Sequence, residues 1–403
     1  MQRVVITGQG TINALGHSAT ETLAGMRQGR SGIGALDFAD VERLSIRIGA
    51  GVKDFRPEDH FSRQQLALYD RFTQFAVHAA REAIVQSGLN FDGELGAEAG
   101  VVLGTAGGGL QTQDENYRSV YQKGQNRVHP FVVPRLMNNA AASHLSMIWG
   151  LRGPVYSVAT ACASSNHAMG QAFQMVRSGV SRVMLTGGAE SMLCFGGLKA
   201  WEGLRVMSPD ACRPFSADRN GMVIGEGAAV FVFEAFEHAR ARGAEILAEV
   251  AGFAMTSDAS DIVMPSAEGA ARAMQGALAD ARLTPAMIGY INAHGTGTAA
   301  NDRTECAAVS EVFGHHADRL MISSTKAMHG HIIGGTGAVE LLACIMALRD
   351  GVIAPTIGYQ EPDPDCALDV VPNVAREARV TAVLSNAFAF GGLNAVLALG
   401  KAP

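Results

Sequence analysis

The sequence has few charged residues, no net positive charge and no long apolar run. Asp, Glu, Lys and Arg make up 17% of the 403 residues, against about 25% in typical globular proteins, and the 48% of hydrophobic residues excludes a disordered chain. The formal charge of −6 argues against a nucleic-acid-binding protein, which normally carries a basic domain. No stretch reaches the roughly 18 apolar residues of a membrane span, and the N-terminal apolar run is too short for a signal peptide. We therefore expect a soluble, cytoplasmic protein with no nucleic-acid partner and no membrane insertion.

Cysteine is also scarce, and its spacing excludes two kinds of small structural site. The six cysteines lie far apart and form no CxxC pair, so the sequence predicts neither a disulfide framework nor a zinc knuckle. A catalytic thiol is left open for one of them. Glycine, by contrast, is abundant: its 47 residues are about 12% of the chain, against a usual ~7%, which predicts many tight turns and close backbone contacts.

The length and the order of local patterns predict an α/β protein with two cores. A chain of 403 residues exceeds the size at which one hydrophobic core usually stops growing. The short β-rich runs RVVITG and AGVVLGT alternate with Ala-rich helical stretches, such as the one from Phe72 to Ser87. This alternation is typical of α/β folds whose strands are largely parallel.

A weak internal repeat indicates that the two cores are related halves. Each half contains a buried strand, a small-residue turn and a second strand, as in SRVMLTGGAES with GAAVFVFEAF and in ARVTAVLSNAFAFGG with LNAVLALG. We assign the halves to residues 1–249 and 250–403. No Pro/Ser-rich linker or charge run separates them, so we expect one continuous interface rather than a tether.

Cys162 is the strongest candidate for a reactive thiol. It lies in TACASS, after the β-rich run VYSVAT and before a helical pattern that starts near Ala163. A thiol at a helix N-terminus gains thiolate character from the helix dipole and the free amides. The alternative is a buried and inert side chain, which is what most free cysteines are.

Two further motifs place basic side chains at the ends of expected strands. NAHGTGT puts His294 after the apolar run MIGYI, and SSTKAMHGH puts Lys326 and His331 after LMI. The carboxyl ends of strands are where α/β proteins bind their ligands. A single histidine of this kind is more often a satisfied structural residue, but three such motifs together indicate one site.

The chain resembles the elongating β-ketoacyl-[acyl carrier protein] synthases in four motifs that occur in the same order: TACASS, NAHGTGT, SSTKAMHGH and NAFAFGGLN. These are condensing enzymes of the KAS I/II type in the thiolase superfamily, and the resemblance runs from RVVITGQG to LNAVLALG. It implies the thiolase fold, an α/β fold in which duplicated βαβαβαββ halves form a layered αβαβα architecture. Segments such as SPDACRPFSADR, DIVMPS and EPDPDC are most similar to the nodulation protein E subgroup.

The resemblance implies a decarboxylative Claisen condensation that lengthens an acyl chain by two carbons. Cys162 would take the acyl chain from acyl carrier protein, and a malonyl thioester would then lose CO2 and attack it. The backbone amides of Cys162 and Phe390 would bind the thioester oxyanion, where the loss of one donor typically costs about 3 kcal/mol. His294 and His331 would stabilise the enolate, which requires at least one neutral imidazole that donates from Nε2–H.

Other residues acquire roles from the same resemblance. Lys326 would form a buried ion pair with Glu305 that orders the site. Gly107 lies in the segment GTAGGGL, which would line the acyl pocket near a dimer interface unless this glycine serves only the turn. The remaining substrate-binding candidates are Thr296 and Thr298, which would bind the pantetheine arm, and Phe388 and Gly391.

Partners are implied as well. The enzyme would act as a homodimer and would need no metal and no organic cofactor beyond the phosphopantetheine of acyl carrier protein. Carrier proteins of this pathway are acidic, so a chain of net charge −6 needs a local basic rim. The candidates for that rim are Arg63, Arg71, Arg127 and Arg205.

Three positions depart from the commoner family pattern. His329 and Leu393 stand where threonine is usual, and Ala389 stands where glycine is usual. None of these changes removes a catalytic group. Ala389 is expected to stiffen a loop that in relatives flips its phenylalanine to admit the acyl chain, because alanine reaches positive φ less readily than glycine.

Two alternatives keep the general fold class but change the chemistry. ITGQGTINALG resembles a dinucleotide-binding fingerprint, although Asn13 replaces the third glycine. A degradative thiolase would need a second catalytic cysteine near the C-terminus, and Cys366 lies in a loop-like stretch without that motif.

Three further alternatives stay within or near the resemblance. A chain-length-factor-like partner subunit of a ketosynthase heterodimer would keep the fold but lack the thiol that Cys162 supplies. A specialised synthase of the nodulation-factor or polyketide type would share the motifs. A metal site formed by His294, His329 and His331 would need an acidic or thiol ligand at fitting spacing, and none is evident.

Overall fold

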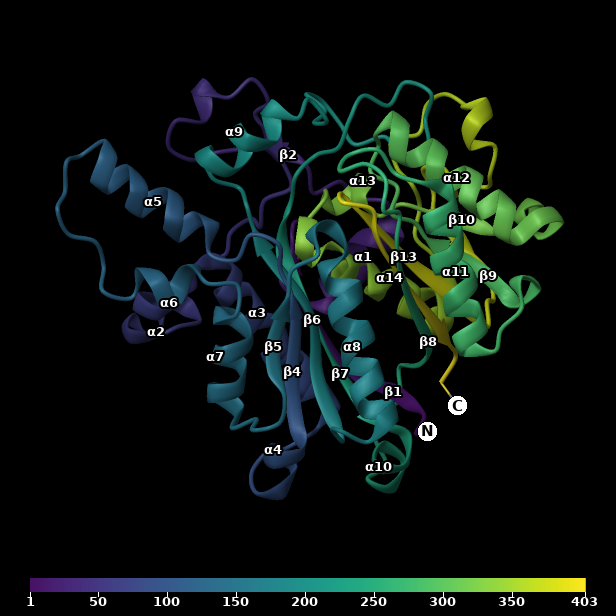
Figure 1. Ribbon diagram of the computed structural model, residues 1–403, viewed down its shortest axis with the longest axis horizontal. Helices are drawn as coiled ribbons and strands as arrows, with labels where there is room; N and C mark the ends of the chain where they lie inside the picture. Colours follow the sequence, from purple (N-terminus) through teal and green to yellow (C-terminus); the bar gives the residue numbers. More distant parts are fainter. Residues whose placement is uncertain (403) are drawn as a thin grey trace.

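One ten-stranded mixed sheet runs through the computed structural model, which describes residues 1–402 (Figure 1). The strand order is β10-β9-β13-β14-β8-β1-β7-β6-β4-β5. The first half of the chain supplies β1 (Val4–Asn13), β4 (Ala99–Gly104), β5 (Val155–Val158), β6 (Val183–Ser191) and β7 (Glu226–Ala235). The second half supplies β8 (Ala248–Ser257), β9 (Ile288–Asn292), β10 (Met321–Ser323), β13 (Ala382–Ala389) and β14 (Leu393–Gly400).

The two halves have the same topology. From edge to centre, β5-β4-β6-β7-β1 corresponds to β10-β9-β13-β14-β8, and β1 pairs with β8 in antiparallel fashion. The helices between the strands are α3 (Arg71–Ser87), α7 (Ala140–Trp149) and α8 (Ser164–Ser178) in the first half, and α11 (Ala267–Ala281), α12 (Ala299–Phe313) and α14 (Thr336–Asp350) in the second. This order confirms the duplicated βαβαβαββ pattern. The division at residue 250 stays a prediction, because β8 crosses it.

Two helices lie at the centre of the layers. α8 packs against β4 and β6 of its own half, α14 packs against β9 and β13, and the two helices contact each other. α14 is buried along nearly its whole length. The outer faces are covered by α3 and α7 on one side and by α11 and α12 on the other (Figure 1). The thiolase-like layering expected from the sequence is therefore present.

Sequence signals account for the main helix boundaries. α3 begins after Asp70, whose carboxylate accepts the backbone N–H of Phe72, and it ends at Gly88 with φ 65°. A left-handed residue at this position closes the last turn of a helix, and glycine adopts it without strain. The helix predicted from Phe72 to Ser87 is confirmed.

The glycines of ITGQGTIN belong to a strand and not to a nucleotide-binding turn. Gly8 and Gly10 lie inside β1, where a Cβ would come within 2.0 Å of the Ala83 carbonyl oxygen and 2.1 Å of the Ala79 carbonyl oxygen. Both contacts are made with α3. These glycines let the helix pack closely on the strand, so the dinucleotide-binding alternative is wrong.

The remaining elements connect and cover this framework. They are α1 (Ala19–Gln28), α2 (Arg63–Leu68), α4 (Glu94–Glu98), α5 (Leu110–Tyr121), α6 (Val132–Leu136), α9 (Phe195–Gly203), α10 (Phe236–Ala241), α13 (Lys326–His329), β2 (Gly34–Ala35), β3 (Ile48–Gly49), β11 (Val352–Ile353) and β12 (Arg376–Glu377). Among residues 1–402, no helix is both long and apolar enough to cross a bilayer.

Candidate active site

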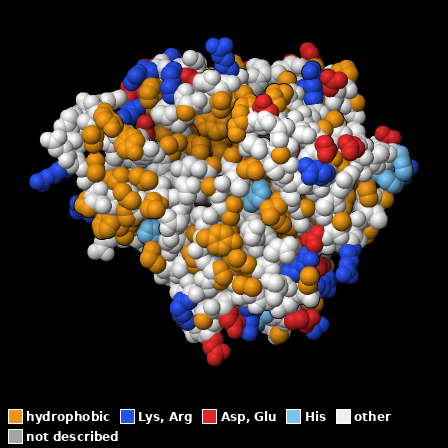
Figure 2. Space-filling view, viewed as in Figure 1, with side chains coloured by type: hydrophobic (Ala, Val, Ile, Leu, Met, Phe, Trp, Pro, Cys, Tyr) orange, Lys and Arg blue, Asp and Glu red, His pale blue; other side chains and the backbone are white. Residues whose placement is uncertain are grey.

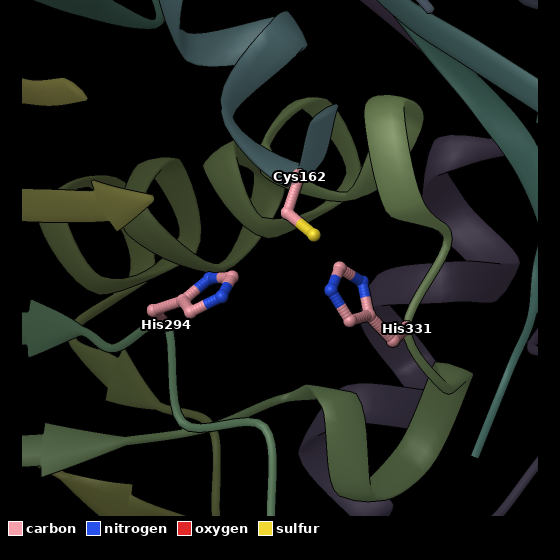
Figure 3. A group of neighbouring side chains, drawn as sticks. All are labelled: Cys162, His294 and His331. Carbon is pink, nitrogen blue, oxygen red and sulfur yellow. The ribbon is translucent and has the colours of Figure 1, made fainter. Parts of the chain in front are cut away.

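Three side chains from separate parts of the chain, those of Cys162, His294 and His331, point toward one another (Figure 3). One ligand atom each of Cys162, His294 and His331 lies within 4.8 Å of the others, and all three residues are buried. The two imidazole rings are 5.5 Å apart and nearly perpendicular. The prediction that these three motifs meet in one place is confirmed.

Each of these side chains follows a strand. Cys162 lies in a 3-10 turn (Ala161–Ala163) between β5 and α8, where Ala161 has a φ of 48°. Two hydrogen bonds fix this turn: the Thr160 N–H donates to Ser164 Oγ at 2.9 Å, and that hydroxyl donates to the Ala161 carbonyl at 2.7 Å. The strand-to-helix turn predicted around Cys162 is therefore present.

The thiol of Cys162 is less acidic than its helix-start position predicts. Burial raises its pKa to about 12, although the charge of Lys326 and the backbone N–H groups of Phe390 and Cys162 itself lower it in part. The expectation of thiolate character was wrong, because desolvation outweighs the helix terminus. The resting side chain is thus a neutral thiol that must lose its proton as it attacks.

The hydrogen bonds of His331 determine which ring nitrogen carries its proton. Its Nδ1 accepts the backbone N–H of Ile333 at 3.1 Å and lies 2.9 Å from Thr336 Oγ1. In a neutral ring the proton is then on Nε2. This Nε2 is buried and has no hydrogen-bond partner within residues 1–402, so it is available to donate to a substrate oxygen.

Both histidines of the site are neutral over the ordinary pH range. Burial is the main cause that moves the pKa of His294 and of His331 well below 6.5, and the charge of Lys326 adds to it. A neutral Nε2–H donor suits a developing negative charge better than it suits a metal ion, which needs a free lone pair. The tautomer of His331 thus argues against metal binding here.

Lys326 pairs with Glu340 and not with Glu305. The Lys326 Nζ and Glu340 Oε1 atoms are 2.5 Å apart, and both residues are almost fully buried. Glu305 instead accepts the backbone N–H groups of His294 at 2.9 Å and Gly295 at 2.8 Å. The predicted ion pair was wrong because α14 places Glu340 against α13, whereas Glu305 lies under the turn that carries His294.

Glu340 and Glu190 are site residues that the sequence analysis missed. Glu340 is the one acidic residue in the apolar stretch TGAVELLACIMAL, a signal that could have identified it. Glu190 is buried, and its carboxylate accepts the backbone N–H groups of Ala106, Gly107 and Gly334. Burial raises the pKa of each of these carboxyl groups to about 7.

A cavity of about 90 Å³ lies over the thiol. The predicted site residues that line it are Cys162, His294, His331, Thr296, Thr298, Phe388 and Phe390. The rest of the lining is formed by Val206, Met222, Val263, Met264, Pro265, Ala300, Asn301 and Ala389. The threonines are hydrogen-bonded to each other, with 2.8 Å between their Oγ1 atoms. The structure thus brings most of the predicted substrate-binding residues to the same cavity as the thiol.

Gly107 and Gly391 do not line this cavity. The Gly107 N–H donates to Glu190 Oε1 at 3.1 Å, and a Cβ at this glycine would lie 2.6 Å from Cε of Met192. Gly391 follows Phe390 and donates its N–H to the carbonyl of Ile262 at 2.8 Å. The proposed contacts of both glycines with substrate stay predictions.

One residue of the expected basic rim is engaged elsewhere. The Arg71 guanidinium forms an ion pair with Glu226, with 2.7 Å between Nη2 and Oε1, so its charge is already paired, and its contact with a carrier stays a prediction. Arg63, Arg127 and Arg205 are exposed. Of these, Arg205 directly precedes the cavity residue Val206.

The layered fold and the central thiol with its two imidazoles define a condensing enzyme of the acyltransferase type. The family model "Beta-ketoacyl synthase, N-terminal domain" matches residues 1–241, and "Beta-ketoacyl synthase, C-terminal domain" matches residues 247–360. The chain belongs to the β-ketoacyl synthase family.

Curated relatives extend over the whole chain. Nodulation protein E of Rhizobium leguminosarum bv. trifolii is 50% identical over 397 residues, which cover 98% of each chain. The 3-oxoacyl-[acyl-carrier-protein] synthase 2 of Staphylococcus aureus (strain N315) is 39% identical over 407 residues, covering 99% of this chain and 98% of that protein. The family and subgroup predicted from the motifs are confirmed.

Solved structures give the same result for the fold. The ishigamide ketosynthase/chain length factor superposes with a TM-score of 0.94 at 37% identity, and a β-ketoacyl synthase from Burkholderia phymatum STM815 with 0.93 at 34%; each alignment covers 100% of both chains. A further match is the AntDE:AntF complex, a type II polyketide ketosynthase with its acyl-carrier protein, at a TM-score of 0.91, 29% identity and 100% coverage of both chains.

Proposed function

We propose that this protein is a β-ketoacyl-[acyl carrier protein] synthase that lengthens a carrier-bound acyl chain by two carbons. The observation that carries this proposal is the convergence of the Cys162 thiol with the unpartnered Nε2–H of His331 in one buried cavity. The thiol supplies a nucleophile and the imidazole supplies a hydrogen-bond donor. These two groups correspond to the two half-reactions of a condensation.

In the first half-reaction, the Cys162 sulfur attacks the thioester carbonyl of the carrier-bound acyl chain. A new C–S bond forms on Cys162, the C–S bond to the carrier's pantetheine breaks, and the thiol proton leaves with the released pantetheine sulfur. The N–H groups of Phe390 and Cys162, which face the sulfur, are positioned to bind the intermediate oxyanion. Because the thiol pKa is about 12, proton loss accompanies the attack.

In the second half-reaction, a malonyl thioester loses CO2 and the resulting enolate carbon attacks the acyl-Cys162 thioester. A C–C bond forms, the bond to the Cys162 sulfur breaks, and the released thiolate takes up one proton from solvent, which restores the thiol. The enolate oxygen accepts the Nε2–H of His331 and a hydrogen bond from His294. This role needs neutral rings, and the lowered pKa values of both histidines support it.

Acyl carrier protein is the partner that this chemistry requires. Thr296 and Thr298 lie at the cavity with Asn301 and are suited to bind a pantetheine amide. We expect no metal or organic cofactor beyond that phosphopantetheine, and the cytoplasmic location stays a prediction. The complex of AntDE with its carrier protein concerns that ketosynthase, but it supports the same kind of partner for this chain.

We also propose a homodimer through the edge strand β5. All four residues of β5 are only half-buried, and an unpaired edge strand favours pairing with another chain. Apolar side chains gather over the neighbouring helices in Figure 2. The exposed ones are Tyr117, Val120 and Tyr121 of α5, Val133 of α6, Met137, and Met147 and Ile148 of α7.

A second candidate function is a specialised synthase of the nodulation type. The nodulation protein E relatives are 46–50% identical to this chain, against 39% for the 3-oxoacyl-[acyl-carrier-protein] synthase 2 relatives. This difference favours a dedicated acyl product over general chain elongation. A chain-length-factor-like subunit is disfavoured, because the complete Cys162, His294 and His331 set is present.

Intact-mass spectrometry tests the proposal. The protein is incubated with carrier proteins that carry acyl chains of several lengths, and we expect one acyl adduct on Cys162, followed by transfer of that chain to malonyl carrier protein. The set of chains that load separates general elongation from a specialised product. Absence of any adduct with every carrier and chain length would contradict the function.

A further inference from the structure

The peptide group of Gly334 lies between two side chains from the first half of the chain. Its N–H donates to Glu190 Oε2 at 3.2 Å, and its carbonyl accepts the hydroxyl of Ser165, which lies on the first turn of α8. A Cβ at this glycine would lie 2.4 Å from the backbone nitrogen of Ala106, so a larger residue would not fit without a shift of the backbone. Gly334 is therefore held at a point where the two halves of the chain meet.

The turn that contains Gly334 also determines the tautomer of His331. The backbone N–H of Ile333 donates to His331 Nδ1 at 3.1 Å, which leaves the proton of the neutral ring on Nε2. Ile333 has a φ of 46°. Positive φ is rare for a β-branched residue and persists only where the surrounding contacts hold it. The hydrogen bonds of the adjacent Gly334 are placed to hold this turn.

Glu190 binds both halves of the chain through one carboxylate. Its Oε2 accepts the backbone N–H groups of Ala106 at 2.7 Å and Gly334 at 3.2 Å. Its Oε1 accepts the N–H of Gly107 and the hydroxyl of Thr105, both at 3.1 Å. The side chain is fully buried at the end of β6, and hydrogen bonds to a carboxylate are stronger than those between neutral groups. Glu190 therefore fixes the first-half segment and the second-half turn against each other.

We propose that Glu190 is a positioning residue that keeps the Nε2–H of His331 available to the substrate, by holding the turn that donates to His331 Nδ1. The inference rests on the proposed function, because the enolate oxygen would accept this Nε2–H. Glu190 does not line the cavity, so it acts through the backbone of the turn and not by contact with substrate. Loss of its carboxylate should therefore release the turn and let the proton of His331 move to Nδ1.

The ionised form of Glu190 is the one that holds the turn. A carboxylate accepts hydrogen bonds at both oxygens, whereas a protonated carboxyl group carries a hydrogen on one of them. Burial raises the pKa of Glu190 to about 7, so the ionised form dominates above that pH and is lost as the pH falls through it. The Cys162 thiol, which also faces Glu190, stays neutral there because its pKa is about 12. The rings of His294 and His331 stay neutral as well, because their pKa values lie well below 6.5.

NMR spectra of protein labelled with ¹⁵N-histidine test this role without any carrier protein. Such spectra distinguish an Nε2–H imidazole from an Nδ1–H imidazole, and the signals of His331 are those that His331→Ala removes. Glu190→Leu is close in size to the parental side chain but has no acceptor. The loss of one hydrogen bond typically shifts an equilibrium about two- to tenfold, so we expect the ratio of Nδ1–H to Nε2–H for His331 to rise by at least that factor.

Glu82→Leu is the matched control. Glu82 is also a half-buried carboxylate that accepts two backbone N–H groups, those of Thr11 at 3.0 Å and Ala19 at 2.8 Å, but it lies on the outer helix α3. This variant should leave His331 in the Nε2–H form. An equal change in both variants would mean that the loss of any such carboxylate loosens the turn, and a parental ratio in Glu190→Leu would overturn the proposal directly.

A pH titration covers the case in which Glu190→Leu does not fold. In the parental protein the Nδ1–H signal of His331 should grow as the pH falls through about 7, because protonated Glu190 releases the turn. Glu190→Gln keeps one acceptor oxygen and cannot titrate, so its spectrum should stay constant over the same range. A change that persists in Glu190→Gln would trace to Glu340, whose pKa is also about 7. That result, or a parental spectrum that does not change, would contradict the role of Glu190.

The spectra do not depend on the reaction, so the role of Glu190 and the proposed function can fail separately. If carrier proteins fail to load Cys162 while His331 changes its tautomer as expected, the proposed function fails and the role of Glu190 stands. If loading and condensation occur while His331 keeps its Nε2–H form in Glu190→Leu, the role of Glu190 fails alone.

Discussion

The two halves of the molecule place different chemistry at the same topological position. In each half the third strand leads into a central helix: β5 leads to α8 through Cys162, and β10 leads to α14 through Lys326 and His331. The first connection has small, uncharged neighbours around a neutral thiol. The second contains the buried Lys326, which pairs with Glu340 of α14, and the imidazole of His331, whose pKa burial lowers. The two equivalent backbone positions thus carry a thiol in one half and a lysine with an imidazole in the other.

One buried charge acts on both connections. Lys326 lowers the pKa of His294 and His331, which keeps the rings neutral, and it also opposes the effect of burial on the Cys162 thiol. Its partner Glu340 comes from α14, so the charge is balanced within the second half. The comparison therefore predicts that a substitution in the first connection abolishes acyl transfer alone. A substitution in the second connection should change the buried charge, the free energy of unfolding and the reaction rate together.

Removal of the thiol should have the largest effect. Cys162→Ala is expected to abolish acyl transfer, because no nucleophile is left, while the unfolding midpoint stays near the parental value since the side chain borders a cavity. Intact-mass measurement of acyl loading and thermal unfolding of the same sample check both parts. A persistent acyl adduct in this variant would locate the nucleophile elsewhere.

Removal of the buried cation should mainly cost stability. Lys326→Ala leaves Glu340 unpaired, which typically costs about 3–5 kcal/mol of unfolding free energy. The second substitution Glu340→Gln should recover part of that loss, whereas Glu305→Gln should not, because Glu305 binds the 294–295 turn instead. Denaturant unfolding of the three variants distinguishes the partners, and recovery by Glu305→Gln alone would contradict the pairing seen here.

The smallest predicted effect is a pH dependence at His329. Burial and the charge of Lys326 lower its pKa to about 3, so the folded protein keeps this ring neutral while the unfolded chain binds a proton below about pH 6.5. The stability that it contributes is complete above that pH and is lost as the pH falls. In His329→Thr the loss of unfolding free energy between about pH 7.5 and about pH 5.5 should be smaller by about 1.4 kcal/mol. An unchanged pH dependence would show that His329 is protonated in the folded state.

Much of the site followed from local sequence patterns. Cys162, His294 and Lys326 each come within a few residues of the end of an apolar strand pattern, His331 follows one short helix later, and strand ends converge in this class of fold. The duplicated topology was visible because each half repeats a buried strand, a small-residue turn and a second strand. These features depend on neighbours in sequence, so the sequence alone was enough.

The errors all concern tertiary effects. The partner of Lys326 depends on how α13 packs against α14, and the thiol pKa depends on how deeply the cavity is buried. Gly8 and Gly10 looked like a nucleotide-binding turn because their spacing does not reveal the α3 backbone that packs on them. Contacts between segments far apart in sequence set each of these features.

The most direct test of the account is a double measurement on His331→Ala. Acyl loading of Cys162 is followed by intact mass, and CO2 release from malonyl carrier protein is followed on the acylated enzyme, with His329→Thr as the matched control. The account predicts loading near the parental rate and CO2 release lowered by about 10²- to 10⁴-fold, because the Nε2–H of His331 serves the enolate and not the thiol. Equal losses in both steps, or CO2 release at the parental rate, would contradict the division of chemistry between the two connections.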